Sequence, residues 1–153
     1  MTNKTLRLDD FLPYQLSVTT QVVSALIAGA YETMFGLRIP EWRVIAILAD
    51  TPSLSQQAIV ERSAMDKMTV SRAASALVTR KLAARVPNGA DKRSHLLALT
   101  PAGERLYAQV APTALKMEAE LLHGFSATDV AALKRMLAKL RDAATGQEIE
   151  NAR

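Results

Sequence analysis

Lysine and arginine residues gather between Arg62 and Arg93, and this stretch has the clearest potential for chemistry. The 32-residue window holds eight of the 19 basic residues and two of the 15 acidic ones, so its net charge is +6. Because the whole chain carries +4, the remainder carries −2. Positive charge confined to one window indicates a surface for a phosphate backbone. The basic residues of the window are Arg62, Lys67, Arg72, Arg80, Lys81, Arg85, Lys92 and Arg93.

Two short helical patterns position the first half of these charges. Ser55 is a typical N-cap for a helix that runs to about Arg62, and Asp66 is one for a helix that runs to about Arg80. The turn between them is residues 63–65. Two short helices joined by so short a turn are typical of a helix-turn-helix, whose second helix contacts bases in the major groove.

The second of these helices has two distinct faces. Its small apolar residues point one way and its short polar residues, with one arginine, point the opposite way, as a recognition helix requires. The apolar face is Val70, Ala73, Ala74 and Leu77; the opposite face is Met68, Arg72, Ser75 and Thr79, with Thr69 and Ser71 on the flanks. A surface helix with scattered polar residues is the alternative, but the charge bias and the following ribbon favour recognition.

A strand-turn-strand pattern follows. Residues 83–86 and 95–99 favour strands, and Asn88-Gly89 in the charged connection suits a tight turn. Helix, turn, helix and ribbon in this order predict a winged helix-turn-helix.

Specific DNA contacts follow from these placements. Arg72 is expected to contact a base edge, most readily guanine, and Thr69 and Ser71 a phosphate or a nearby base. Arg93 at the tip of the wing is expected in the minor groove, with Asp91 holding its guanidinium in place. The full set of expected DNA contacts is Ser55, Lys67, Thr69, Ser71, Arg72, Ser75, Arg85, Asp91, Lys92 and Arg93.

Longer helical patterns flank this region on the N-terminal side. Apolar spacing predicts a helix over residues 8–35, capped by Asp9 or Asp10 and ended by Gly36. A second helix is expected over residues 41–50. Their apolar residues recur at helical spacing, which predicts packing against the rest of the chain.

Two more helices are expected on the C-terminal side. Thr100 followed by Pro101 predicts the start of a helix that runs to about His123, and Ser126 with Asp129 resembles a capping box for the next. In that last helix a narrow leucine stripe suits a partner helix; it consists of Val130, Leu133, Leu137 and Leu140. The tail from Gly146 is expected to fray.

The motifs Asp91-x-Arg93, Leu97-x-Leu99-Thr100 and Gly103 resemble those of the multiple-antibiotic-resistance regulator (MarR) family. The resemblance implies a mainly α fold with a small β-ribbon, in a homodimer built on the first, fifth and sixth helices. It implies one domain over residues 1–146, in which 8–36 and 101–145 form the dimerisation helices and 40–100 the DNA-binding lobe, with 147–153 a frayed tail.

The same resemblance implies a function. Such proteins are transcription regulators, usually repressors that bind a palindromic operator in double-stranded DNA. A small ligand, often an aromatic acid, releases them. One departure from the family pattern is Lys81, where glycine is common. If the backbone is left-handed there, lysine costs roughly 1 kcal/mol relative to glycine. The alternative is an altered helix end, which would change the angle of the wing.

A pocket for an aromatic acid or phenol is expected between the two lobes. The candidate ligand-binding residues are Tyr14, Tyr31, Trp42 and Arg43, although such aromatic residues are by default part of a core.

Other functions are disfavoured by what the sequence contains. It has no cysteine, no protease, hydrolase or P-loop motif, and no second metal ligand at a recognisable spacing from either histidine, so neither an enzyme nor a metal or cofactor site is expected. No apolar run is long enough for a membrane span, and the expected location is the cytoplasm. The rival hypothesis is a winged helix that binds only protein, which would not need so large a positive charge.

Overall fold

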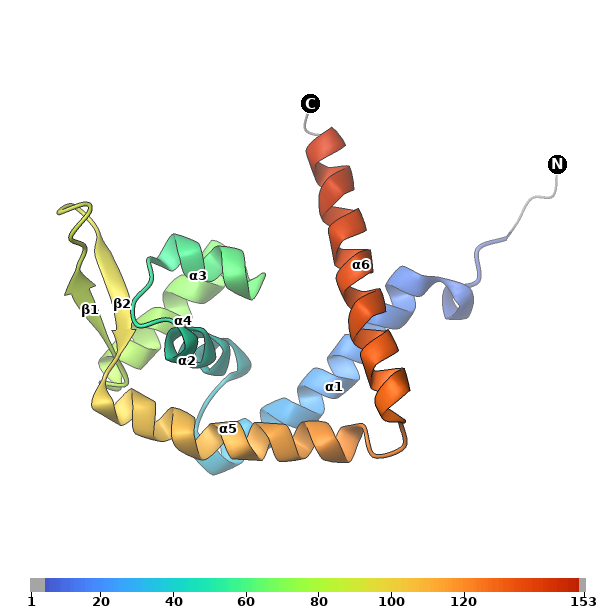
Figure 1. The fold of residues 1–153 in the computed structure, drawn as a ribbon, viewed down its shortest axis with the longest axis horizontal. Coiled ribbons are helices and arrows are strands. Elements are labelled where there is room, and N and C mark those ends of the chain that lie inside the picture. Colours follow the sequence, from blue (N-terminus) through green and yellow to red (C-terminus); the bar gives the residue numbers. More distant parts are fainter. Residues whose placement is uncertain (1–4, 152–153) are drawn as a thin grey trace. The chain divides into compact units, whose positions relative to one another are not determined.

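The computed structural model describes residues 5–151, which form six α-helices, one short 3-10 helix and a two-stranded antiparallel sheet (Figure 1). The chain divides into two compact units, residues 1–114 and 115–153. The first unit contains every element from the 3-10 helix to the first half of α5, and with them the predicted winged helix-turn-helix. The fold is therefore mainly α with a small β-ribbon, as expected from the sequence.

The first helix starts later than its sequence suggested. A 3-10 helix, η1, occupies Leu8–Asp10, and α1 then runs over Leu12–Phe35. The expected cap by Asp9 or Asp10 is wrong: Phe11 is the N-cap and makes no side-chain hydrogen bond. Pro13 in the first turn lacks an amide hydrogen and needs no partner there. Gly36 ends the helix as predicted, with a left-handed φ of 60°.

The second helix, α2 (Ile39–Asp50), meets α1 at a sharp corner of 78°. Its inner face buries Val44, Ile45 and Leu48, and the corner residue Leu37 is fully buried. Among the described residues no single helix is both long and apolar enough to cross a membrane, although α1 and α2 taken as a bent pair reach that length and hydropathy.

The predicted helix-turn-helix is α3 (Gln56–Ser63) followed by α4 (Lys67–Thr79). Both expected caps are confirmed: the Ser55 hydroxyl accepts the Ala58 amide at 3.1 Å, and the Asp66 carboxylate accepts the Thr69 amide at 2.8 Å. The apolar face of α4 packs on α2 and α3. Its members, Val70, Ala73, Ala74 and Leu77, are all buried, as the helical wheel predicted.

The wing consists of β1 (Ala83–Pro87), β2 (His95–Leu99) and the turn between them. The register pairs Ala83 with Leu99 and Pro87 with His95. On its other edge β2 forms a bridge to Leu54, since the Leu54 and Leu97 amides and carbonyls bond to each other at 3.0 and 2.7 Å. The wing is thus attached at its base to the segment that precedes α3.

The base of the wing also contacts the start of α5 (Pro101–Leu121). The Thr100 hydroxyl donates to the Lys81 carbonyl at 2.7 Å and accepts the Gly103 amide at 3.1 Å, which confirms Thr100 as the cap. A Cβ on Gly103 would lie 2.0 Å from the Leu82 carbonyl oxygen. Only glycine therefore permits this approach between the helix and the strand.

The second unit holds the end of α5 and α6 (Ala127–Asn151). The capping box is confirmed, because Ser126 and Asp129 each accept the other's amide at 3.1 Å. The Ser126 hydroxyl also donates to the Asp129 carboxylate at 2.7 Å, and this bond, followed by the one from the Ser126 amide, lowers the pKa of Asp129. The helix continues past Gly146 to Asn151, and residues 152–153 lie outside the described residues; fraying of the tail stays a prediction.

Within residues 5–151, two residues that are not glycine have left-handed backbones, and they flank α4. Ala64 has a φ of 53° in the turn before the helix, and Lys81 has a φ of 59° directly after it. The conformation suspected at Lys81 from the sequence is therefore present, and the side chain there is exposed.

Lys81→Gly should raise the free energy of unfolding by about 1 kcal/mol, because glycine adopts this conformation without a clash of its Cβ. Denaturant unfolding of the full chain measures the change. The matched control is Lys139→Gly, on the exposed part of α6, which should lower stability by about 0.5–1 kcal/mol. Equal losses in both variants would contradict a cost at Lys81.

Candidate nucleic-acid interface

The outward face of α4 is available for contact. Lys67, Arg72 and Ser75 are exposed, and Ser71 is partly buried. No hydrogen bond or ion pair within the described residues engages the side chains of Arg72 or Ser75. These groups are free to bond with a ligand, as direct readout of bases requires.

Two other expected contacts already have partners within the chain. The Thr69 hydroxyl donates to the Asp66 carboxylate at 2.6 Å, and the Ser55 hydroxyl accepts the Ala58 amide as the N-cap of α3. The bonds from the Thr69 hydroxyl and then its amide lower the pKa of Asp66. Thr69 and Ser55 therefore serve first to hold the ends of their helices.

A hollow of about 250 Å³ lies beside Arg72, between the side of α4 and the first turn of α2. Arg38 and Glu41 line it from α2, and Thr69 and Ala73 from α4. Two arginines therefore border the space next to the exposed face of α4, which adds to the positive charge at this surface.

The turn of the wing is built by short side chains bonded to its own backbone. The side-chain oxygen Oδ1 of Asn88 accepts the Ala90 amide at 3.0 Å, and the side-chain nitrogen Nδ2 of Asn88 donates to the Ser94 hydroxyl at 2.9 Å. The predicted tight turn at Asn88-Gly89 is wrong, since Gly36 is the only glycine with a positive φ among the described residues. Seven residues, 88–94, instead separate the strands.

Asp91 holds this turn through the backbone. Its carboxylate accepts the Arg93 amide at 2.9 Å, and its carbonyl accepts the Ser94 amide at 3.1 Å. Among the ion pairs of the described residues there is none between Asp91 and the guanidinium of Arg93. The direct hold expected from the sequence is therefore not present, and Asp91 instead fixes the backbone from which Arg93 projects.

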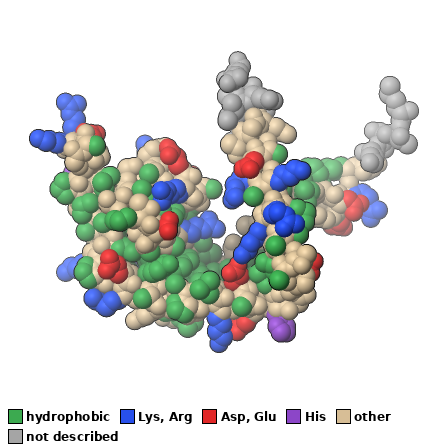
Figure 2. Space-filling model, viewed as in Figure 1, with side chains coloured by type: hydrophobic (Ala, Val, Ile, Leu, Met, Phe, Trp, Pro, Cys, Tyr) green, Lys and Arg blue, Asp and Glu red, His purple; other side chains and the backbone are tan. Residues whose placement is uncertain are grey.

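The cations of the wing remain exposed. Arg85 lies on β1 opposite Leu97, and Lys92 and Arg93 lie in the turn. In Figure 2 blue side chains gather at the free end of the ribbon, away from the body of the first unit. The wing thus presents positive charge at its tip.

Two cations of the basic window act within the fold instead. The Arg62 guanidinium donates to the Thr51 hydroxyl at 2.7 Å, and the Arg80 guanidinium donates to the Gly36 carbonyl at 2.8 Å. The partner of Arg80 lies 44 residues away, so no local pattern in the sequence could have revealed this contact.

Three aromatic rings form a row in the first unit. Tyr31 and Trp42 have ring centroids 5.6 Å apart, and Trp42 stacks on Tyr107 at 5.7 Å. Tyr31 is 4% exposed, and burial raises its pKa, so its hydroxyl stays protonated. Tyr107 was missed by sequence reasoning, because α5 gave no signal other than helical spacing.

The other two candidate ligand residues are not part of this row. Tyr14 lies on the same helix as Tyr31, about 25 Å before it at 1.5 Å per residue, and Arg43 is exposed on α2. A hollow of about 330 Å³ lies next to the row, lined by Tyr107 and Glu104 from α5 and by Leu48 and Pro52 from α2 and its end.

Comparison with known proteins is consistent with this geometry. The model of the MarR family matches residues 35–94, which cover the end of α1, α2, the helix-turn-helix, β1 and the turn of the wing. The transcriptional regulator HosA of Escherichia coli is 28% identical over 101 residues, which cover 66% of this chain and 75% of HosA.

Two solved structures are similar along most of the chain. A MarR/EmrR family transcriptional regulator from Acinetobacter sp. ADP1 is 28% identical with a TM-score of 0.85, covering 92% of this chain and 99% of that one. BpsR of Bordetella bronchiseptica is 25% identical with a TM-score of 0.83, covering 90% and 97%. These relatives are transcriptional regulators and not enzymes.

Removing the carboxylate of Asp91 tests how the wing turn works. Asp91→Ala should weaken binding to duplex DNA although it removes a negative charge, because the backbone that carries Arg93 loses its anchor. Fluorescence anisotropy with a labelled duplex measures the change. Asp142→Ala, which removes an exposed acid from α6, is the control and should leave affinity unchanged. Tighter binding by Asp91→Ala would show that its charge matters more than its turn.

Proposed function

We propose that this chain, which is similar to transcriptional regulators of the MarR family, binds a palindromic operator as a homodimer and represses transcription until a small aromatic acid releases it. The observation that carries the proposal is the exposed face of α4. There Arg72 and Ser75 have no partner among the described residues, while the opposite face is fully buried. A helix fixed on one side and free on the other suits insertion into a major groove.

The wing supplies the second contact with DNA. With α4 in the major groove, the adjacent minor groove is the next surface that the ribbon meets. Arg93 suits that groove because its guanidinium is weakly hydrated and the potential there is negative. Lys92 and Arg85 add phosphate contacts, which position the protein without reading sequence.

Exposed apolar residues on α1 and α6 support the dimer. On α1, Val18, Val22 and Leu26 are exposed at a spacing of four residues. On α6, Leu133, Leu137 and Leu140 are exposed on one stripe. Rows of this kind on long helices are usually covered by another helix. With two α4 helices facing one side of a duplex, the half-site centres lie about 10 base pairs apart.

The aromatic row supports the effector. Trp42, Tyr31 and Tyr107 offer flat apolar surfaces, and Arg43 is an exposed cation one residue from Trp42. In the related BpsR, 6-hydroxynicotinic acid regulates DNA binding. We therefore place an aromatic carboxylic acid or phenol beside this row. Tyr14 lies about 25 Å along α1 from Tyr31, too far to join this row from the same chain.

Arg72→Ala should lose about 1–3 kcal/mol of binding to a duplex selected from a random library with the unaltered chain, and should relax the preference at one base pair. Arg141→Ala on α6 is the control for loss of an exposed arginine and should bind normally. Equal losses on the selected duplex and on an unrelated one would make Arg72 a phosphate contact only.

Light scattering at micromolar concentration should give about twice the chain mass of 16.6 kDa. Leu137→Asp should dissociate or unfold the dimer, because it places a charge in an apolar contact. Lys139→Asp introduces the same carboxylate on the opposite side of α6 and should leave the mass unchanged. A monomer that binds the selected duplex with full affinity would rule the dimer out.

Trp42 is the only tryptophan of the chain, so its fluorescence can report an effector directly. Titration with benzoate, hydroxybenzoates and hydroxynicotinates should identify a compound that quenches this emission and releases DNA. Tyr107→Ala should weaken both effects together, since it removes one stacked ring. If no compound in the panel changes DNA affinity, an aromatic acid is not the effector.

A further inference from the structure

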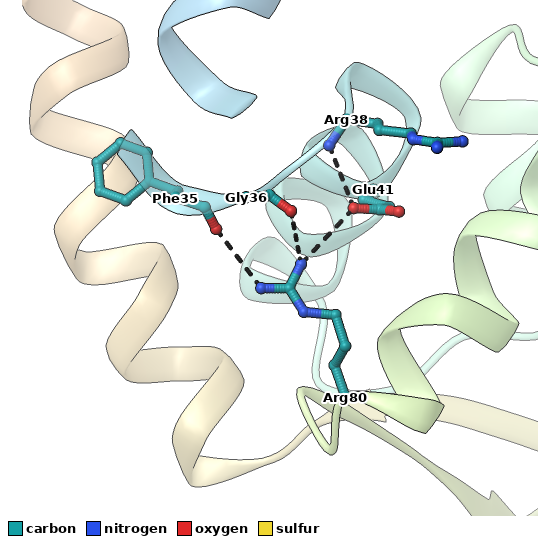
Figure 3. Close-up of polar contacts among 5 residues, drawn as sticks. All are labelled: Phe35, Gly36, Arg38, Glu41 and Arg80. Atoms are coloured by element: carbon teal, nitrogen blue, oxygen red, sulfur yellow. Dashed lines mark hydrogen bonds and ion pairs between the residues drawn. The ribbon is translucent and has the colours of Figure 1, made fainter. Parts of the chain in front are cut away.

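We propose that Arg80 is a positioning residue, which fixes the orientation of α4 relative to α1 and so determines DNA affinity without contacting DNA. The inference rests on the proposed function for its effect on DNA binding. Figure 3 shows the arrangement: the Arg80 side chain extends from the end of α4 to the corner between α1 and α2.

The guanidinium of Arg80 contacts three acceptors at that corner. One nitrogen, Nη1, lies 2.8 Å from the Gly36 carbonyl and 3.8 Å from the Glu41 carboxylate, while Nη2 lies 3.5 Å from the Phe35 carbonyl. The two carbonyls terminate α1, where the backbone has no helical partner for them and carries partial negative charge. A cation is favoured at that position.

Glu41 connects the same cluster to α2. Its carboxylate also accepts the Arg38 amide at 3.1 Å, in the capping box that begins α2. The Glu41 side chain is 13% exposed and that of Arg80 40%, so the pair is partly shielded from water. One arginine and one glutamate therefore join the end of α1, the start of α2 and the end of α4.

The contacts require an arginine at this position. The planar guanidinium donates to two adjacent carbonyls while it forms an ion pair with a carboxylate, whereas a lysine ammonium is a single point of charge on a flexible chain. The next residue, Lys81, turns the chain into the wing with its left-handed backbone. Fixing Arg80 therefore also fixes the point at which the wing leaves α4.

This role has a consequence for DNA binding that differs from that of a phosphate contact. If α4 holds its correct orientation only a tenth of the time without Arg80, affinity falls about tenfold. No ion pair with DNA is lost, however. The number of counterions released on binding, and with it the salt dependence of affinity, stays the same.

The first test compares Arg80→Met and Arg80→Lys in the full chain, using a duplex selected with the unaltered protein. Positioning predicts that both variants bind about tenfold more weakly, with an unchanged slope of log affinity against log salt. A phosphate contact predicts that the lysine variant keeps its affinity and that the methionine variant loses about 0.9 in slope. Lys92→Met removes one proposed phosphate contact and shows the size of that loss.

Glu41→Gln gives a result of opposite sign under the two accounts. Removing an acid near DNA and freeing Arg80 should strengthen binding if Arg80 contacts phosphate. Under the positioning role the substitution weakens binding, because the guanidinium loses its charged partner at the corner. Normal affinity in all three variants, with only a lower melting temperature, would mean that the cluster is merely structural and would overturn the inference.

A final measurement needs no DNA. The chain has no cysteine, so Thr20→Cys on α1 and Met68→Cys on α4 allow two spin labels, with labelled chains diluted into unlabelled ones. Arg80→Met should broaden the distribution of distances between the labels. An unchanged distribution would overturn the positioning role. If the unaltered chain selects no duplex at all, the proposed function fails, and this measurement still decides the role of Arg80.

Discussion

Close packing of small side chains beneath α4 is the constraint on which the structure depends. Ala73 and Ala74 are buried between α4 and its neighbours α2 and α3, with Val70 and Leu77 above and below them along the helix. Residues of this size bring the backbones near one another and leave little freedom to shift. The same approach recurs at the base of the wing, where Gly103 meets the Leu82 carbonyl. Close approach of backbones at these small residues therefore supplements the packing of the larger buried side chains of the winged helix-turn-helix, such as Ile45, Ile59 and Leu77.

The positive charges of this region divide into two groups with different tasks. Lys67, Arg72 and Arg93 point away from the first unit without partners among the described residues, whereas Arg62 and Arg80 satisfy acceptors within it. The net charge of the window, counted from the sequence, does not distinguish these two groups. Fewer cations than the eight of the window are accordingly free for direct contact with DNA, while Arg62 and Arg80 help to fix the elements that carry the free ones.

Much of the fold could be predicted because its signals are local. A cap such as Ser55 or Asp66, a glycine such as Gly36 and the faces of α4 all act within one turn of helix, so the sequence shows them directly. What could not be predicted depends on distant partners. Arg80 finds its acceptors across 44 residues, and Tyr107 joins Trp42 from a different helix. The predicted start of α1 was wrong for another reason. Asp9 and Asp10 are suitable N-cap residues, but they lie in a 3-10 helix that ends before α1 begins.

The division of labour along α4 bears on how such a protein can diverge. Thr69 and Asp66 form hydrogen bonds with each other that hold the first turn of α4. Substituting either residue would therefore lower the stability of the fold as well as any contact with DNA. The side chains of Arg72 and Ser75 make no such bonds among the described residues. Substitutions at these two positions can accumulate at nearly constant stability, and under the proposed function each one would alter which base pairs are preferred. Duplicated copies of this chain could therefore acquire separate target sites by a few changes on one helix face, while the buried alanines and Gly103 stay under selection for packing alone.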